Sequence, residues 1–292
     1  MTFLSYLISG ISLGSVYALI ALGYTMVYGI AKMLNFAHGD VIMIGGFVVF
    51  TAVSSMNTSA PIAIVCGIIA CVVLGVAIEK IAYKPLRNAT PLAVLITAIG
   101  VSYFLQNLAL IIFGSAAKNF PDILKLEDLQ LTESLTITGE AVATILITIV
   151  IMIVLTLFIN YTKIGTAMQA VSEDRGAAQL MGVNVNTTIS ITFAIGSALA
   201  AVASVLLCAS YPLLSPYTGA MPGIKAFTAA VFGGIGSIPG AMIGGILLGV
   251  IENLSKAYIS TELSDAIVFG VLIIVLIVKP TGILGKKMNE KV

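Results

Sequence analysis

Long runs without a charged residue dominate this chain, and they limit the folds that it can adopt. The runs cover residues 1–31, 41–78, 88–117, 141–162, 176–224, 226–251 and 266–278. A helix needs about 20 apolar residues to cross the hydrocarbon core of a bilayer. The residues are 59% hydrophobic and only 9% charged, and no soluble core needs this much apolar length. We therefore expect a membrane protein that crosses the bilayer many times.

The number of crossings follows from the breaks in these runs. The segment from Asn57 to Pro61 divides the second run into two helices, because both residues favour turns. The expected fold is all-α, with about eight or nine transmembrane helices in a single transmembrane domain over residues 1–292. The N-terminal residues MTFLSYLIS include no basic residue, so we expect the first apolar segment to stay as a span and not to be cleaved as a signal peptide.

The distribution of Lys and Arg predicts the orientation, because cytoplasmic loops carry an excess of both. Two segments are basic: one loop with Lys80, Lys84 and Arg87, and the C-terminus with Lys279, Lys286, Lys287 and Lys291. The segment 114–140 instead carries Asp122, Glu127, Asp128, Glu133 and Glu140 against Lys118 and Lys125. We expect this acidic segment outside, and counting spans from it places the loop 162–187 in the cytoplasm.

The same count predicts a broken helix near the C-terminus. Residues 224–262 must start and end outside, and the segment includes the helix-interrupting residues Gly233, Gly234, Gly236, Pro239 and Gly240. We expect two half-helices over residues 224–256, as a re-entrant or broken element. Irregular backbone at membrane depth occurs where it is buried in protein or lines a water-filled cavity, so this element is a candidate wall of a translocation path. A kinked span with a different topology is the alternative.

A second break contains the polar residues Asn35, His38, Gly39 and Asp40. Charged and polar groups within a membrane are costly and tend to face a cavity or each other. These residues are therefore candidates for a polar path or its gates. Alternatively, Asn35 and Asp40 cap the ends of two half-helices, with Asp40 at the positive end of the second.

Three further polar residues lie within or at the ends of apolar runs. Gln106 and Asn107 belong to the span ITAIGVSYFLQN and are further path candidates. Glu252 follows the apolar run 226–251. It is either part of a polar route or a solvated helix end.

Catalysis and nucleic-acid binding have little support. His38 is the only histidine, and Cys66, Cys71 and Cys208 lie in apolar stretches without a His or Cys at metal-ligand spacing. A phosphate-binding GxxxxGK[ST] loop is absent from the sequence. The net charge of +1 offers no basic surface for phosphates. We expect no catalytic residue, metal or cofactor on this chain, and no nucleic-acid partner.

Small residues recur at four-residue spacing in Gly10/Gly14, Gly240/Gly244 and Gly245/Gly249. This spacing lets helix backbones approach closely in a membrane. It indicates either mobile packing around a path or ordinary helix packing.

A polar insert separates two long apolar spans at residues 162–187. It places Glu173, Asp174 and Arg175 ahead of Ala177, Ala178 and Gly182. An integral membrane protein with few polar residues can use such a loop to dock a soluble partner.

Several motifs together resemble the branched-chain amino acid ABC-importer permeases, and more narrowly the shorter of the two paired permease subunits of the leucine/isoleucine/valine system. The resemblance extends from about Ser9 to Gly285 and rests on family motifs that are specific in combination. They are LNFAHGDVIMIGG, YKPLR, ITAIGVSYFLQN, GTAMQAVSEDRGAAQLMGVNV and KAFTAAVFGGIGSIPGAMIGGILLG.

The resemblance implies a multi-pass protein of a bacterial or archaeal cytoplasmic membrane, embedded in lipid. It implies a homologous second permease subunit, two ATP-binding subunits that carry ATP and Mg, and an extracytoplasmic substrate-binding protein. It also implies that a short coupling helix, from about Glu173 to Met181, lies in a groove of the ATP-binding subunit and ends at Gly182. The family's EAA-type pattern is not contiguous here, since Glu173 is separated from Ala177 and Ala178.

The substrate expected from the resemblance is leucine, isoleucine or valine. A sister system for another amino acid, urea or a short amide is an alternative. An ABC permease for a sugar, a secondary transporter that works without ATP and a membrane-embedded enzyme are more distant alternatives.

Overall fold

The computed structural model describes residues 2–87, 89–124, 126–132 and 135–285. Five of the charges used above lie outside the described residues, namely Lys125, Glu133, Lys286, Lys287 and Lys291. The helices are α1 (Thr2–Ala31), α2 (His38–Ser54), α3 (Ala60–Ile78), α4 (Pro91–Phe113), α5 (Gly139–Tyr161), α6 (Lys163–Glu173), α7 (Arg175–Leu180), α8 (Val185–Ser210), α9 (Ala220–Gly233), α10 (Ile238–Tyr258) and α11 (Ser264–Val278). A π-helical turn, Glu79–Tyr83, and a 3-10 turn, Lys84–Leu86, continue α3. The short strands are β1 (Lys118–Asn119), β2 (Leu129–Thr132), β3 (Leu135–Ile137) and β4 (Leu213–Leu214).

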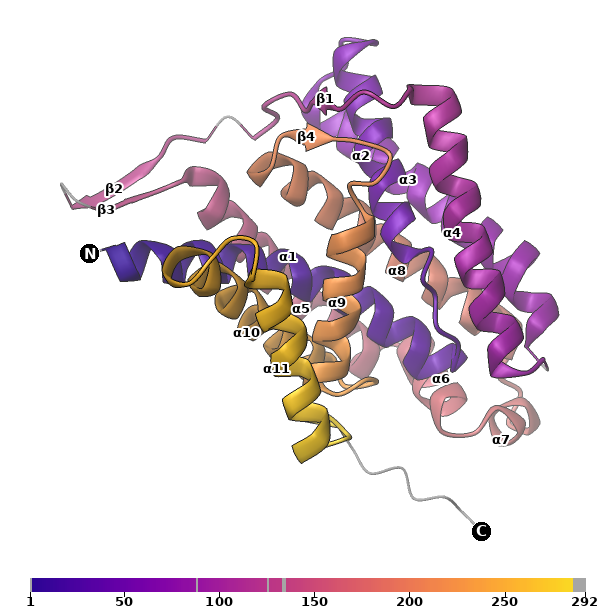
Figure 1. Cartoon of the computed structure of the whole chain (residues 1–292). Coiled ribbons are helices and arrows are strands. Elements are labelled where there is room, and N and C mark those ends of the chain that lie inside the picture. The colour runs from indigo at the N-terminus through magenta and orange to yellow at the C-terminus, as the bar shows by residue number, and fades with distance from the viewer. Residues whose placement is uncertain (1, 88, 125, 133–134, 286–292) are drawn as a thin grey trace.

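Six of the described helices are long and apolar enough to cross a membrane: α1, α3, α4, α5, α8 and α10. The helices α2 and α11 are shorter but also apolar, and α9 adds a further 14-residue helix. Figure 1 shows that these helices make up nearly the whole molecule. The fold class expected from the sequence, an all-α polytopic membrane protein, is therefore confirmed.

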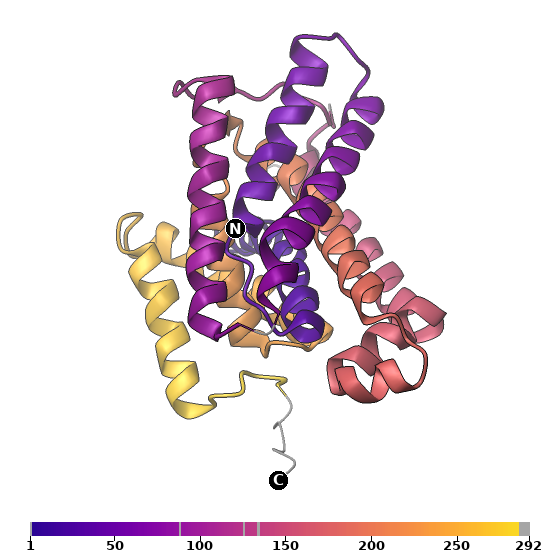
Figure 2. The same cartoon turned by 90° about the vertical axis from the view of Figure 1, so that its right-hand side faces the viewer.

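Helix α1 lies in the interior of the bundle. Every residue from 12 to 27 is buried, as expected of a helix that is apolar on all sides. Helices α10, α8, α9 and α5 pack around it (Figures 1 and 2). In contrast, only 22% of the residues in the apolar stretches of α4 and of α5 are buried. These two helices therefore lie at the periphery and present apolar side chains outward.

Small residues bring α1 and α10 close together. A Cβ atom added at Gly245 would lie 2.5 Å from the Cα of Ala18, and one added at Gly14 would lie 2.7 Å from the Cα of Ile246. Neither position has room for a larger side chain. The four-residue spacing of glycines in the sequence therefore corresponds to a tight helix–helix contact.

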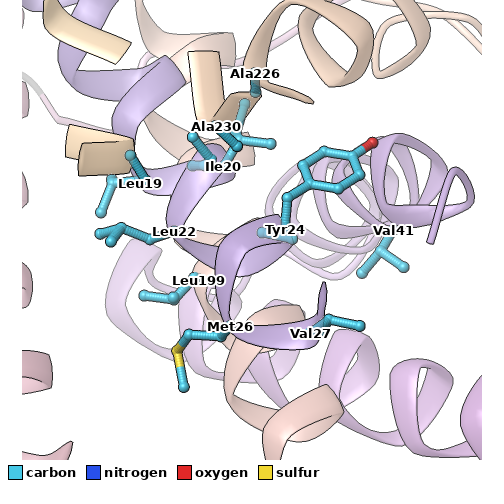
Figure 3. Close-up of a cluster of buried hydrophobic side chains, with 14 of the residues drawn as sticks. Leu19, Ile20, Leu22, Tyr24, Met26, Val27, Val41, Leu199, Ala226 and Ala230 are labelled. Atoms are coloured by element: carbon cyan, nitrogen blue, oxygen red, sulfur yellow. The ribbon is translucent and has the colours of Figure 1, made fainter. Parts of the chain in front are cut away.

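The core around α1 is drawn in Figure 3. Side chains of α1 meet Val41 of α2, Leu199 of α8, and Ala226 and Ala230 of α9. All of these side chains are buried. Because both α9 residues are alanines, that helix can also approach α1 closely.

The helices break at the places where Gly, Pro or polar residues interrupt the apolar runs. Lys32, which follows α1, has a φ of 52°, and Asn57, between α2 and α3, has a φ of 50°. Gly234 and Gly236, between α9 and α10, have φ angles of 109° and 91°. These left-handed conformations suit glycine and, less well, asparagine.

Helices α9 and α10 form an antiparallel hairpin around this last break. A Cβ at Gly240 would lie 2.5 Å from the carbonyl oxygen of Gly233. Farther from the turn, the Nζ atom of Lys225 lies 2.8 Å from the Oε1 atom of Glu252. The start of α9 and the end of α10 therefore lie at the same end of the bundle.

The connecting segments gather at two opposite ends of the helix bundle. Helices α4 and α5 each run from one of these ends to the other. At one end, β1 pairs with β4 and so attaches the segment 114–140 to the connection between α8 and α9. We call this the β1–β4 end. At the other end, Arg87 donates to the side chain of Asn186, which brings the basic loop 79–90 beside the loop 162–187. We call this the α7 end.

Candidate functional site

Helix α6 is amphipathic and lies against the bundle at the α7 end. The hydroxyl of Thr162 caps it, since the Oγ1 atom accepts a hydrogen bond of 3.0 Å from the amide of Gly165. Gly165, Met168 and Val171 are its buried residues, and their three-residue spacing places them on one helix face. This face fixes α6 on the bundle and thereby holds α7 in place.

Helix α7 is a short, exposed helix with a defined start and end. The carboxylate of Asp174 caps its N-terminus by accepting from the amide of Ala177 at 2.9 Å. At its C-terminus, the amide of Gly182 donates to Gln179 and the amide of Val183 donates to Ala178. Gly182 has a φ of 85°, which suits a glycine that ends a helix.

The expected helix from Glu173 to Met181 differs from the observed one. Glu173 is the last residue of α6, and Asp174 is extended, with φ and ψ of −153° and 113°. Because the side chain of Asp174 caps α7, its own backbone leaves the helical conformation. The segment is therefore two helices, and α7 itself spans only Arg175–Leu180.

The exposed surface of α7 is apolar at its tip. Leu180 is 90% exposed and Met181 is 85% exposed, whereas Ala178 is buried. Two large apolar side chains at the tip of a cap-stabilised helix are a typical protein contact surface. Leu180 and Met181 were absent from the candidates chosen from the sequence, although they stand between Ala178 and Gly182 in the same motif.

Arg175 fastens α7 to the interior helix α1. Its guanidinium donates a hydrogen bond to the carbonyl oxygen of Ala31, the last residue of α1. Burial and, next, the positive charge of Arg87 lower the pKa of Arg175 below its usual value. Arg87 itself pairs with the buried carboxylate of Glu79. Two guanidinium groups are therefore held close together, each by a partner on a different helix.

A groove of about 700 Å³ lies between α7, the basic loop and the start of α8. Its basic side chains are Lys84, Arg87 and Arg175. The remaining lining residues are Gly176, Gln179, Gly182, Val183, Asn184, Val185, Asn186 and Ile189. The groove thus joins the two loops that the sequence predicts on one side of the membrane.

The residues of the first break are buried between helices. The hydroxyl of Tyr83 donates to the Oδ1 atom of Asn35 at 3.0 Å, and the ring of His38 meets the ring of Tyr24 edge-on, with centroids 4.8 Å apart. Gly39 packs against Gly219, because a Cβ added at Gly39 would lie 2.5 Å from the carbonyl oxygen of Gly219. A role of these residues in a translocation path stays a prediction.

Of the capping alternative, the structure retains only the position of Asp40. Asp40 lies in the first turn of α2, near its positive end, but the N-cap is Ala37 and no side chain caps this end by a hydrogen bond. The Oδ1 atom of Asp40 accepts a hydrogen bond of 2.9 Å from the Nε2 atom of Gln106. Asn35 instead uses its side chain to accept from Tyr83, so it caps neither helix.

Gln106 and Asn107 are neighbours in the sequence but have different surroundings. Gln106 is buried and joins α4 to α2 through Asp40. Asn107 is exposed, and its Nδ2 atom donates to the carbonyl oxygen of Tyr103 on its own helix. The structure therefore brings Gln106 into the group of break residues and leaves Asn107 outside it.

The second break is held by glycine contacts and by the C-terminal segment. Gly233 meets Gly240 across the turn, and Pro239 stands in the first turn of α10. The amides of Ile283 and Leu284 donate hydrogen bonds of 2.9 Å to the carbonyl oxygens of Phe232 and Gly233. The backbone carbonyls freed at the break are thus paired within the protein.

A buried charged network surrounds Glu252, and none of the groups that pair with it was expected from the sequence. The carboxylate of Glu252 accepts from the hydroxyl of Tyr17 at 2.9 Å, from Lys225 at 2.8 Å and from Lys256 at 2.6 Å. Lys225 also pairs with Asp265 at 2.7 Å. Glu252 is only 1% exposed, so its interpretation as a solvated helix end is wrong. The sequence did carry a sign of this network. Lys225 is an isolated charge between two long charge-free runs, and Glu252, of opposite charge, ends the second run.

Within the part of the chain that the structure describes, no three His, Cys, Asp or Glu side chains lie close enough together to hold a metal ion.

The fold and these sites define a polytopic, mainly helical membrane protein with charged groups paired between its helices. The chain belongs to the family described as "Branched-chain amino acid transport system / permease component", whose model matches residues 6–276. It is 47% identical to the high-affinity branched-chain amino acid transport system permease protein LivH of Escherichia coli (strain K12), over 99% of this chain and 98% of that protein. It is 46% identical to LivH of Salmonella typhimurium and 44% identical to the permease protein BraD of Pseudomonas aeruginosa, with the same coverage.

Proposed function

We propose that this chain is a transmembrane permease subunit of an ATP-binding-cassette importer that takes up leucine, isoleucine and valine. The observation that carries the proposal is the similarity, over 99% of this chain, to permease proteins named for high-affinity branched-chain amino acid transport. The absence of a phosphate-binding loop from the sequence fits a transport subunit that depends on partners for its energy.

The segment α6–α7 is the proposed contact with an ATP-binding subunit. Its support is the apolar tip formed by Leu180 and Met181, the caps at Asp174 and Gly182, and the attachment of Arg175 to α1. A rigid, exposed helix that is fastened to an interior span can transmit motion from a soluble subunit to the bundle. ATP and Mg bind to the partner subunits and not to this chain.

The α7 end is proposed to face the cytoplasm, since the basic residues Lys80, Lys84 and Arg87 lie there. The β1–β4 end then faces outward and receives the substrate-binding protein. A homologous second permease completes the path, and the whole assembly resides in the cytoplasmic membrane of a bacterium or archaeon. The break residues near Asn35 and Gly234 are proposed to line or gate this path.

Uptake by the reconstituted importer tests the proposal. The chain, its second permease, both ATP-binding subunits and the binding protein are placed in liposomes, and labelled leucine, isoleucine and valine are supplied outside. We expect uptake that requires ATP on the side of the α7 end, with an ATPase-inactive partner as the control. Uptake by this chain alone on an ion gradient would instead indicate a secondary transporter. Uptake of urea or a short amide without these amino acids would indicate a sister system.

A charged residue at the tip of α7 tests the contact. Leu180→Glu should abolish co-purification of the ATP-binding subunits while the permease still folds. Leu263→Glu is the matched control, because Leu263 is also an exposed leucine, at 54%, but precedes α11 at the other end. Normal co-purification of the Leu180 variant would contradict this contact.

A further inference from the structure

A cavity of about 220 Å³ lies beside the buried charged network, toward the β1–β4 end. Its lining is both polar and apolar. The charged side chains are Lys225, Glu252 and Lys256, and Tyr17, Tyr211 and Thr218 add hydroxyl groups. The apolar residues include Leu13, Leu207 and Met221.

We propose that this cavity binds one neutral aliphatic amino acid, in its zwitterionic form, during transport. The inference rests on the proposed function and adds to it a place on this chain where the solute is held. Three properties of the cavity suit such a solute, namely its charge pattern, its size and its position.

The cation for the solute carboxylate is Lys225. Its Nζ atom lies 2.8 Å from Glu252 and 2.7 Å from Asp265, and the side chain of Asp265 is 41% exposed. A half-exposed carboxylate is rehydrated at little cost when its partner leaves, because exposed ion pairs are weak. The solute carboxylate can therefore take the place of Asp265 while Lys225 stays paired with Glu252.

The anion for the solute ammonium group is Glu252. Its Oε2 atom accepts from the hydroxyl of Tyr17, and a carboxylate oxygen can accept more than one hydrogen bond. Its Oε1 atom accepts from Lys225 and from Lys256, whose side chain is 31% exposed. Lys256 can turn toward water and leave this oxygen to the ammonium group.

The charges of the network select a solute without net charge. Two lysines face two carboxylates, so the four groups are balanced. A zwitterion keeps this balance, whereas a basic or acidic amino acid would add an unpaired charge where Glu252 is only 1% exposed. An unpaired charge in such a place is strongly unfavourable.

The size and position of the cavity also suit a single amino acid. Pockets for drug-sized ligands measure about 300–1,000 Å³, and this one is smaller. Leu13, Leu207 and Met221 offer apolar contacts to an aliphatic side chain. The cavity borders Leu213 of β4, at the end proposed to receive the binding protein.

The test fills the cavity with a large side chain in the complete reconstituted importer. Met221→Trp is compared with Ile224→Trp, since Met221 and Ile224 lie on α9 and are both 44% exposed, but only Met221 borders the cavity. Uptake is measured with saturating, loaded binding protein, so that the selectivity of that protein does not enter the comparison. We expect Met221→Trp to lower the maximal rate at least about tenfold, because overpacking excludes the solute, and Ile224→Trp to remain close to the unchanged protein.

A second variant covers the case in which Met221→Trp does not assemble. Met221→Ala enlarges the cavity and should raise the ratio of the maximal leucine rate to the maximal valine rate, while Ile224→Ala leaves that ratio unchanged. Equal behaviour of the Met221 and Ile224 variants, with normal leucine uptake by the unchanged protein, overturns the cavity and leaves the proposed function in place. Transport only of a solute without ammonium and carboxylate groups overturns both proposals.

Discussion

The guanidinium of Arg175 donates a hydrogen bond to the carbonyl oxygen of Ala31, which lies 144 positions earlier in the sequence. Ala31 ends α1, and the carbonyls of a last helical turn lack partners within their own helix. The positive charge of Arg175 also complements the negative end of the helix. One side chain therefore connects the exposed helix α7 to the helix at the centre of the bundle.

The same central helix carries Tyr17, whose hydroxyl binds Glu252. Between these two contacts, α1 packs tightly along α10, where Gly245 meets Ala18. A displacement of α7 can thus reach the charged network through α1, by contacts that are continuous along the helix.

Removal of the Arg175 side chain should uncouple ATP hydrolysis from transport. Hydrogen bonds to charged groups contribute about 1.5–3 kcal/mol, so Arg175→Ala should lower uptake by about tenfold or more. Hydrolysis by the assembled ATP-binding subunits should fall less than uptake does. The measurement is the number of amino acids taken up per ATP hydrolysed in liposomes.

Gln179→Ala serves as the control for this variant, because Gln179 lies on the same helix and is exposed. Arg175→Lys should not restore coupling fully, since an ammonium group lacks the planar fork of a guanidinium. An unchanged uptake-to-hydrolysis ratio in Arg175→Ala would show that this contact does not transmit motion.

Much of the fold could be predicted from the sequence because local features encode it. Charge-free runs long enough for a bilayer gave the helices, and Gly234 and Gly236 marked a break because glycine alone adopts their φ angles easily. The helix end at Gly182 follows from the same property. These features are local in the sequence, so they can be recognised without knowing which helices are neighbours.

The pairing within the charged network could not be predicted, because its members come from four helices. Tyr17, Lys225, Glu252 and Asp265 belong to α1, α9, α10 and α11, and no spacing in the sequence pairs them. The division of the expected Glu173–Met181 helix was missed for a different reason. In the sequence Asp174 stands in a charged group with Glu173 and Arg175, and nothing there distinguishes a solvated carboxylate from one that caps a helix.

Gly182 should be sensitive to the backbone conformation that a substitution allows. Its φ of 85° disfavours residues with a Cβ, by about 1–2 kcal/mol, and most of all β-branched ones. An added Cβ would meet nothing within 4 Å, so the effect is conformational and not steric. Gly182→Val should reduce co-purification of the ATP-binding subunits, and Gly182→Asn should reduce it less.

Gly176→Ala is the matched control for Gly182, because Gly176 is also an exposed glycine of this region but lies within α7. Alanine there should stabilise the helix by roughly 0.5–1 kcal/mol. Co-purification is measured by affinity capture of the permease. Equal recovery with valine and asparagine at position 182 would contradict a conformational role.

Glu252 should be essential for the stability of the folded chain. Glu252→Gln leaves Lys225 and Lys256 with one fewer buried anion, and breaking a buried ion pair costs about 3–5 kcal/mol. Tyr17→Phe removes one hydrogen bond from the same carboxylate and should cost only about 1 kcal/mol. The thermal midpoint of the purified permease complex should therefore fall far more for the first variant.

Glu262→Gln, at an exposed glutamate between α10 and α11, should leave this midpoint unchanged. The double variant Tyr17→Phe with Glu252→Gln should lose less stability than the sum of the two single losses, because the two groups share one contact. Full additivity of the two losses would contradict the hydrogen bond between them.

Gly245 should accept no larger side chain without a loss of folded protein. A Cβ there would lie 2.5 Å from the Cα of Ala18, so Gly245→Val forces α1 and α10 apart at a cost of about 1–3 kcal/mol or more. Gly270→Val is the control, because a Cβ at Gly270 meets nothing within 4 Å. Size-exclusion profiles and thermal midpoints of the solubilised chain measure the difference. Ala18→Gly should not restore Gly245→Val, since the backbone of Ala18 and not its Cβ is nearest to the added atom, and equal profiles of Gly245→Val and Gly270→Val would contradict the close contact.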